Sequence, residues 1–180
     1  MVYVLLGTGF EEIEALTPVD LLRRAGVEVK TVGLNGKIVY GGHAIGVEAD
    51  LTIEELDVRD AEMIVLPGGL GGVASIRGCE KALAAVKAVA AAGNYIAAIC
   101  AGPTVLADLG LLSGVQATCY PGQIPNMKDA LVAENAACVT DGKVITGTSA
   151  GTAVPFALAL IEALKGAEAA RVIADQIVIR

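Results

Sequence analysis

The stretch Tyr95-Ile-Ala-Ala-Ile-Cys-Ala-Gly-Pro103 decides how the rest of the chain is interpreted. Its apolar half, 95–99, predicts a short buried strand, and Pro103 favours the first turn of a helix. The small residues on either side of Cys100 let the chain bend sharply between these two elements. We therefore expect Cys100 on a tight strand-to-helix turn, where the bend exposes its sulfur.

Such a turn predicts a reactive cysteine. The unpaired N–H groups at a helix N-terminus favour thiolate over thiol, and we expect them beside Cys100. The backbone N–H of Ala101 would point to where an oxyanion forms. The alternative is a small buried core cysteine, which is a common fate of this residue. The chemistry of the turn favours the reactive thiol.

Outward from this stretch, apolar strand candidates alternate with helical patterns. The expected strands cover 2–6, 27–32, 61–66, 95–99 and 144–146, with a strand pair over 37–47 and short strands at 116–119, 137–139 and 177–179. The expected helices cover 11–25, 79–92, 103–109, 153–164 and 167–175. This alternation predicts one α/β domain over residues 1–180, with three layers and a mainly parallel sheet.

Composition narrows the classes of function. The chain has 180 residues, of which 54% are hydrophobic and 18% charged, so it can build a large core. Its net charge of −7 argues against nucleic acid as a ligand. We see neither a membrane span nor a signal peptide and expect a cytoplasmic protein without membrane contact. Four cysteines without a C-x-x-C pair, and a single histidine, argue against a metal site.

A second glycine-rich turn, 69–74, fits the dinucleotide pattern G-x-G-x-x-A after a predicted strand. The acidic residue expected roughly 20 positions later, on the ribose, is missing. After Glu80 the next acidic residue is Asp108. The alternative is a tight turn whose glycines free backbone N–H groups.

A third turn, 147–151, fits the serine nucleophile pattern G-x-S-x-G between a strand and a helix. A hydrolase of that kind needs a histidine after the serine, and the only histidine, His43, lies far upstream. The alternative is a glycine turn in which Ser or Thr caps the next helix.

The fourth turn carries three carboxylates, Glu11, Glu12 and Glu14, at a helix start, where they complement the dipole. Glu14 lies one turn beyond Glu11 and could face the sheet edge beside Cys100. An ionised Glu14 would raise the pKa of that thiol, whereas a protonated one would donate a hydrogen bond to the thiolate. The pair makes chemical sense only if partial burial keeps Glu14 largely neutral.

Together these turns resemble the ThiJ/PfpI superfamily, in the branch of the Parkinson-disease-associated protein deglycase and its bacterial relatives. The similarity covers essentially the whole chain. It is carried by Gly9-Phe-Glu-Glu-Ile-Glu-Ala15, Pro18-Val-Asp-Leu-Leu-Arg-Arg-Ala-Gly26, Val65-Leu-Pro-Gly-Gly69, Ala97-Ala-Ile-Cys-Ala-Gly-Pro103 and Phe156-Ala-Leu-Ala-Leu-Ile-Glu-Ala-Leu164.

The resemblance implies a flavodoxin-like sandwich, a homodimer and catalysis without an added cofactor. It places the reactive cysteine of a strained elbow at Cys100 and the protonated glutamate at Glu14. It places the oxyanion-hole amides at Gly69 and Ala101. Members of the family are described as glyoxalases, as deglycases of glycated amines, and as oxidation sensors or chaperones. Older descriptions call them peptidases or thiamine-biosynthesis proteins.

Two positions depart from the family pattern. Tyr120 stands where many members place a histidine, and tyrosine is a poor general base at neutral pH. Thr148-Ser-Ala-Gly151 stands where close relatives carry Arg-Gly-Pro-Gly. A peptidase-like Cys–His dyad would therefore need His43 to reach the site. We expect a surface or dimer-contact role for His43 instead.

Our leading hypothesis is the cofactor-free conversion of methylglyoxal or glyoxal to a hydroxy acid, or removal of such groups from glycated amines. Cys100 would attack the aldehyde, Gly69 and Ala101 would hold the oxyanion, and Glu14 would move a proton between adjacent carbons. The rival hypothesis is an oxidative-stress sensor or redox-regulated chaperone that uses oxidation of Cys100. A third alternative is cysteine-dependent hydrolysis of an amide.

Overall fold

The computed structural model describes residues 1–179, and its centre is a seven-stranded sheet. The strands lie in the order β10-β11-β7-β6-β1-β2-β5. All neighbouring strands are parallel except the pair of β10 and β11. The predicted mainly parallel sheet is confirmed. The strands are β1 (Val2–Leu6), β2 (Val29–Gly33), β5 (Leu51–Thr52), β6 (Met63–Leu66), β7 (Tyr95–Ile99), β10 (Cys138–Asp141) and β11 (Val144–Gly147).

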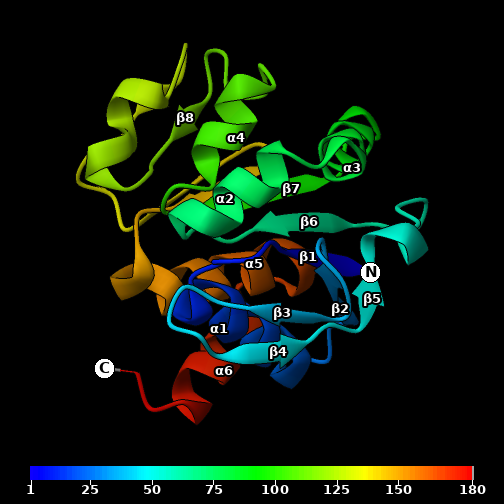
Figure 1. Cartoon of the computed structure of the whole chain (residues 1–180). Helices are drawn as coiled ribbons and strands as arrows, with labels where there is room; N and C mark the ends of the chain where they lie inside the picture. Colours follow the sequence, from blue (N-terminus) through cyan, green and yellow to red (C-terminus); the bar gives the residue numbers. More distant parts are fainter. Residues whose placement is uncertain (180) are drawn as a thin grey trace.

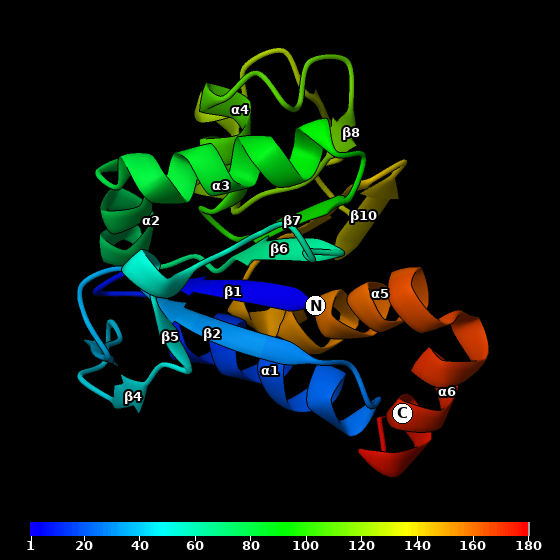
Figure 2. The same ribbon diagram turned by 90° about the vertical axis from the view of Figure 1, so that its right-hand side faces the viewer.

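Helices cover both faces of this sheet (Figures 1 and 2). One face carries α1 (Glu12–Arg24), α5 (Ala153–Lys165) and α6 (Ala167–Gln176), and the other carries α2 (Leu70–Arg77), α3 (Glu80–Ala91) and α4 (Pro103–Asp108). Alternate residues of β1 pack into two hydrophobic cores, one on each face of the sheet. Leu5 packs in the cluster that contains Val86, and Val4 packs in the cluster that contains Phe156. Burial on both faces explains why the strands are continuous apolar runs. The predicted three-layer α/β architecture is confirmed.

Smaller elements lie in the segments between the main strands and helices. The strand pair expected over 37–47 forms as the antiparallel hairpin of β3 (Ile38–Tyr40) and β4 (Gly46–Glu48), which is separate from the main sheet. The short strands β8 (Gln116–Ala117) and β9 (Leu131–Val132) pair with each other. Residues 1–179 also contain three short 3-10 helices: η1 (Ile53–Glu55), η2 (Pro121–Asn126) and η3 (Ala150–Thr152).

The prediction of a last strand over 177–179 is wrong. Helix α6 runs to Gln176, and the residues after it form a turn in which Val178 has a positive φ of 58°. The backbone N–H groups of Ile177 and Ile179 donate back to the carbonyls of Ile173 and Ala174. The β-branched run therefore ends a helix, because its amides are used by that helix rather than by a neighbouring strand.

The order of strands brings four loops to one edge of the sheet. The carboxyl ends of the parallel strands β1, β6, β7 and β11 meet there, and ligands of open α/β sheets bind at such an edge. The loops that follow these strands carry the candidate site residues. Within residues 1–179, no helix has the length and apolar character that crossing a membrane requires.

Candidate active site

Cys100 lies on the expected sharp turn between β7 and α4. Its φ of 64° is in the left-handed region, which costs a residue with a side chain about 1–3 kcal/mol. Two backbone hydrogen bonds hold this conformation: the N–H of Cys100 donates to the carbonyl of Gly147 over 3.0 Å, and its own carbonyl accepts from the N–H of Tyr120 over 2.9 Å. The sheet and the loop after β8 thus fix the backbone of Cys100.

Two backbone amides converge on the sulfur. The N–H groups of Ala101 and Gly69 both donate hydrogen bonds to the Cys100 side chain. Gly69 reaches this position with a φ of 84°, and a Cβ there would lie 2.5 Å from the carbonyl oxygen of Gly9. Only glycine fits this close approach. The structure therefore brings both predicted amides to the predicted cysteine.

Glu14 supplies a buried carboxyl group beside the sulfur. It projects from the first turn of α1 and is 1% exposed. Its Oε2 accepts the backbone N–H of Gly68 over 2.9 Å, and the carboxyl group also hydrogen-bonds the thiol of Cys100. Burial raises the pKa of Glu14 to about 7, although the hydrogen bonds from Cys100 and Gly68 act in the opposite direction.

The thiol itself is shifted in the direction opposite to our expectation. Burial, followed by the charge of Glu14 and the hydrogen bond to it, raises the pKa of Cys100 to about 12. The N–H groups of Ala101 and Gly69 oppose this shift without cancelling it. The expectation that a helix N-terminus would dominate was wrong, because burial and a neighbouring carboxylate outweigh two amides. The pair therefore releases its first proton near neutral pH, and a protonated Glu14 removes its repulsion from the sulfur.

A cavity of about 310 Å³ opens above the sulfur. Its lining residues are Glu11, Gly69, Leu70, Cys100, Ala101, Tyr120 and Gln123. Sequence reasoning did not identify Leu70, because it lies inside a glycine motif read as a possible phosphate loop. It also missed Gln123, which lies in the short 3-10 helix η2, a segment without any distinguishing sequence pattern. Tyr120, considered only as a replacement for a family histidine, forms part of the wall.

The glycines of 69–74 serve packing inside the protein. A Cβ on Gly72 would lie 2.7 Å from the Cα of Phe10, so the space that glycine leaves is filled by the chain itself. Phe10 is 1% exposed and anchors this contact. A pyrophosphate has no room against Gly72, and the tight-turn alternative describes this stretch better than the dinucleotide pattern does.

The serine motif forms a capped turn. Ser149 precedes the short helix η3, and its backbone N–H donates to Oγ1 of Thr152 over 3.0 Å. The chain's single histidine, His43, bonds to Glu12 instead. The capping alternative therefore describes 147–151.

His43, Glu11 and Glu12 form a second polar cluster, with potential ligand atoms within 4.8 Å of one another. Oε1 of Glu12 accepts the backbone N–H of His43 over 2.8 Å, and its Oε2 lies 3.0 Å from Nδ1. The hydrogen bond to Glu12, and then the charges of Glu11 and Glu12, raise the pKa of His43. These bonds tie the β3–β4 hairpin to the start of α1. His43 is not among the described residues that line the cavity, so the structure does not bring it to Cys100.

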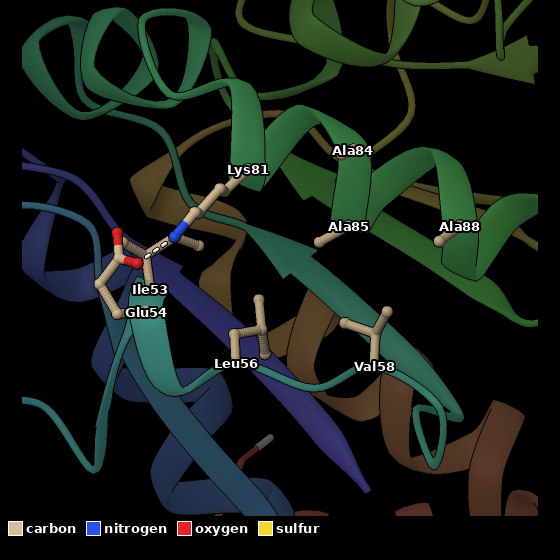
Figure 3. A pocket seen from close by; sticks show the side chains of 8 residues that line it. All are labelled: Ile53, Glu54, Leu56, Val58, Lys81, Ala84, Ala85 and Ala88. Carbon is tan, nitrogen blue, oxygen red and sulfur yellow. Dashed lines mark hydrogen bonds and ion pairs between the residues drawn. The ribbon is translucent and has the colours of Figure 1, made fainter.

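Another hollow, of about 340 Å³, lies between α3 and the segment 53–58 (Figure 3). Its walls are largely apolar, and Lys81 and Glu54 form an ion pair at one end. The residues that line it are Ile53, Glu54, Leu56, Val58, Lys81, Ala84, Ala85 and Ala88. None of these eight residues offers the thiol and buried carboxyl group found beside Cys100. We therefore place the candidate active site at Cys100.

Comparisons with known proteins show which family the chain resembles over most of its length. A model of the DJ-1/PfpI family matches residues 1–163. The chain is 35% identical to protein dj-1beta of Drosophila melanogaster over 178 residues, covering 98% of this chain and 95% of the relative. It is 31% identical to a deglycase of Pyrococcus abyssi, covering 86% and 90% of the two chains. The solved structure of oxidized Toxoplasma gondii DJ-1 superposes with a TM-score of 0.94 at 35% identity, covering 98% of this chain and 97% of that chain.

Proposed function

The chain belongs to the DJ-1/PfpI family, and from this membership we propose that it is a cysteine-dependent, cofactor-free enzyme that converts 2-oxoaldehydes to 2-hydroxy acids. Methylglyoxal and glyoxal are the simplest substrates of this class. One observation carries the proposal: a buried glutamic acid with a pKa of about 7 hydrogen-bonds a cysteine that opens into a cavity. A carboxyl group with that pKa can both take and return a proton at neutral pH.

In the first step Glu14 acts as the base for Cys100. Ionised Glu14 takes the thiol proton while the sulfur forms a bond to the aldehyde carbon, and the electrons of the C=O bond move to oxygen. The amides of Gly69 and Ala101, which already point at the sulfur, then donate to this oxygen. Glu14 returns its proton to the oxygen and completes a hemithioacetal.

In the second step Glu14 moves a proton between adjacent carbons. It removes the hydrogen of the former aldehyde carbon as a proton, which leaves an enediolate with its negative charge on the former ketone oxygen. The proton of the neighbouring hydroxyl group moves to that oxygen, and Glu14 then delivers its proton to the former ketone carbon. The product is a 2-hydroxy thioester of Cys100. Water then cleaves the C–S bond, releasing the acid and restoring the thiol. The aldehyde carbon is oxidised and the ketone carbon is reduced, so the overall reaction consumes only water.

Deglycation would use the same attack. The adduct of a 2-oxoaldehyde with an amine retains a carbon at the aldehyde oxidation level, and Cys100 could displace the amine there. The Pyrococcus abyssi relative carries the name deglycase, which supports this extension. Because such adducts form reversibly, removal of free aldehyde also reverses glycation.

A second candidate function is oxidation sensing, including redox control of a chaperone activity. A peroxide would transfer one oxygen atom to the Cys100 thiolate, with loss of water, and a second peroxide would give the sulfinate. Protonated Glu14 and the amides of Gly69 and Ala101 could donate to these oxygens. The Toxoplasma gondii relative was solved as an oxidized protein, which favours considering this reaction.

We further propose that two copies of the chain associate. Exposed apolar side chains gather on the start of α1 and on the β3–β4 hairpin, which Glu12 joins: Ile13, Ile38, Tyr40 and Ile45. Ile13, for example, is 53% exposed. Sedimentation of the Ile13→Asp variant should show monomers if this surface forms the contact, and an unchanged dimer would assign the contact to another surface.

The four cysteines are free, which is compatible with a cytoplasmic site of action.

Product analysis tests the proposed reaction. Wild type is incubated with methylglyoxal in buffer free of amines and thiols, and lactate is measured by proton NMR beside loss of aldehyde. Glu14→Gln should slow the addition of the aldehyde to Cys100 and lower lactate formation by at least about 100-fold, because both steps need the carboxylate as a base. Loss of aldehyde without lactate in the wild type would contradict the proposal. Mass spectrometry of peroxide-treated protein would then test oxidation of Cys100.

A further inference from the structure

The cavity is larger than a small 2-oxoaldehyde requires. Its volume of about 310 Å³ falls at the lower end of the range that holds drug-sized ligands, about 300–1,000 Å³. The polar groups that the proposed reaction uses are concentrated around Cys100. A substrate such as methylglyoxal would occupy that part alone and leave the outer part to water.

The outer part of the cavity is bounded by two exposed apolar side chains. Leu70 begins α2 and is 72% exposed, and Tyr120 precedes η2 and is 49% exposed. Single exposed apolar residues are common on protein surfaces and need no explanation. Leu70 and Tyr120 differ from such isolated residues because both lie on the wall of one cavity that also contains a nucleophile. An apolar group bound in this cavity would cover both side chains.

The position of Tyr120 is fixed relative to the sulfur. Its N–H donates to the carbonyl of Cys100 over 2.9 Å, and its own carbonyl accepts the N–H of Gln123 over 2.7 Å. A Cβ on Gly122 would lie 3.2 Å from the ring, so the ring packs closely over that glycine. The backbone of Tyr120 is therefore bonded directly to the residue that carries the reacting sulfur, and its ring lies on the wall of the same cavity.

The charge of the cavity wall indicates which substituents the substrate can carry. Glu11 is the charged side chain among the seven described lining residues, and no Lys or Arg is among them. Nδ1 of His43 lies 3.7 Å from Oε1 of Glu11, but His43 bonds Glu12 and does not line the cavity. A carboxylate or phosphate on the substrate would meet an unfavourable like charge there. An uncharged substituent avoids this cost.

We propose that Leu70 and Tyr120 form an apolar subsite that selects 2-oxoaldehydes carrying an uncharged aryl or branched-alkyl substituent. This inference rests on the proposed function, because it names the substrate class of the same site. The reacting head group binds at Cys100 as before, and the substituent lies against the Tyr120 ring and the Leu70 side chain. Methylglyoxal is then a minimal substrate that leaves the subsite empty.

Turnover of two substrates with the same head group tests the subsite. Phenylglyoxal and methylglyoxal are compared in the wild type, Tyr120→Ala, Leu70→Ala and Tyr120→Phe, with Leu131→Ala as an exposed apolar control outside the cavity. The wild type should favour phenylglyoxal by about tenfold in kcat/KM, the low end for contacts in an apolar pocket. Tyr120→Ala and Leu70→Ala should each remove most of this preference, whereas Tyr120→Phe and Leu131→Ala should retain it. An unchanged ratio in both alanine variants would overturn the inference and leave the proposed function intact.

A second readout separates the subsite from turnover. Cys100 is alkylated with iodoacetamide and with its N-benzyl derivative, which share one reactive group and differ by a benzyl group. The rate ratio should favour the benzyl reagent in the wild type and fall about tenfold in Tyr120→Ala. If neither aldehyde is consumed, the proposed function fails, and this ratio alone decides the subsite. A fall in the ratio would support an apolar subsite, and an equal ratio in both proteins would overturn it.

Discussion

The carboxyl group of Glu14 hydrogen-bonds the thiol of Cys100 and joins the first turn of α1 to the elbow after β7. The two groups lie far apart in the sequence and meet because β1 and β7 deliver their following loops to the same sheet edge. Burial raises the pKa of Glu14 to about 7 and, with the charge of Glu14, raises that of Cys100 to about 12. Over the intervening pH range the pair therefore carries a single negative charge.

This shared charge predicts the pH dependence of the reaction. The proposed first step requires ionised Glu14, so kcat/KM for methylglyoxal should be low at pH 5 and rise through a midpoint near the pKa of about 7. It should then stay level to pH 9, well below the pKa of Cys100. Initial rates in amine-free buffers over this range provide the measurement. A rise centred near about 8.5, the value of an ordinary thiol, would contradict the role given to Glu14.

Burial of ionised Glu14 should also lower the free energy of unfolding, and this effect should appear only as the pH rises toward the pKa of Glu14, about 7. Its pKa is raised from 4.5 to about 7, so the folded protein binds more protons there than the unfolded chain does. The associated stability is fully present below 4.5 and is lost as pH rises through about 7. Glu14→Gln should therefore raise the free energy of unfolding by about 1–3 kcal/mol at pH 8 and leave it unchanged at pH 4.

Urea unfolding at both pH values measures this difference. Glu11→Gln is the matched control, because Glu11 lies on the same helix start and is partly exposed rather than buried. Equal effects of Glu14→Gln at pH 4 and pH 8 would show that the substitution acts through packing rather than through charge.

Gly68 should not tolerate a side chain. A Cβ at this position would lie 2.3 Å from Oε2 of Glu14 and 2.7 Å from Cβ of Cys100. Gly68→Ala should therefore lower stability by about 1–3 kcal/mol and lower kcat/KM by roughly 100-fold, because it moves both reacting groups apart. Gly78→Ala is the control, because its Cβ meets nothing closer than 3.5 Å. Similar losses of activity in the two variants would refute this explanation.

His43 offers a direct check of the β3–β4 hairpin. It is the single histidine of the chain, so its imidazole signals in a proton NMR titration need no assignment. Its pKa should exceed the ordinary value of 6.5, because Glu12 bonds Nδ1. Glu12→Gln should lower that pKa toward 6.5. The same midpoint in both proteins would mean that the hairpin does not rest on Glu12 in solution.

The sequence allowed most of the scaffold to be predicted, because its strands are apolar runs and its helices have clear ends. Tyr95–Ile99 and the turn at Cys100 form as expected, since small residues and Pro103 leave few other conformations. Helix α2 was not predicted because its second and third residues are glycines, which weaken the helical pattern. The run 177–179 was misassigned because β-branched residues favour strands only where a neighbouring strand is available.

At the site, the residues were predictable but their electrostatics were not. Cys100, Glu14, Gly69 and Ala101 are brought together as the sequence patterns and the family resemblance indicated. The direction of the thiol pKa depends on how deeply the pair is buried, which no local pattern records. Leu70 and Gln123 reach the cavity through tertiary contacts, so their positions could be obtained only from the structure.

Lactate formation from methylglyoxal by the wild type and by Cys100→Ser, in a buffer without amines or thiols, tests the central claim most directly. We predict steady turnover in the wild type and none above buffer in Cys100→Ser, because the serine hydroxyl is a far weaker nucleophile beside Glu14. Equal lactate formation by both proteins, or none by the wild type, would contradict the assignment of Cys100 and Glu14 as the centre of a 2-oxoaldehyde-converting enzyme.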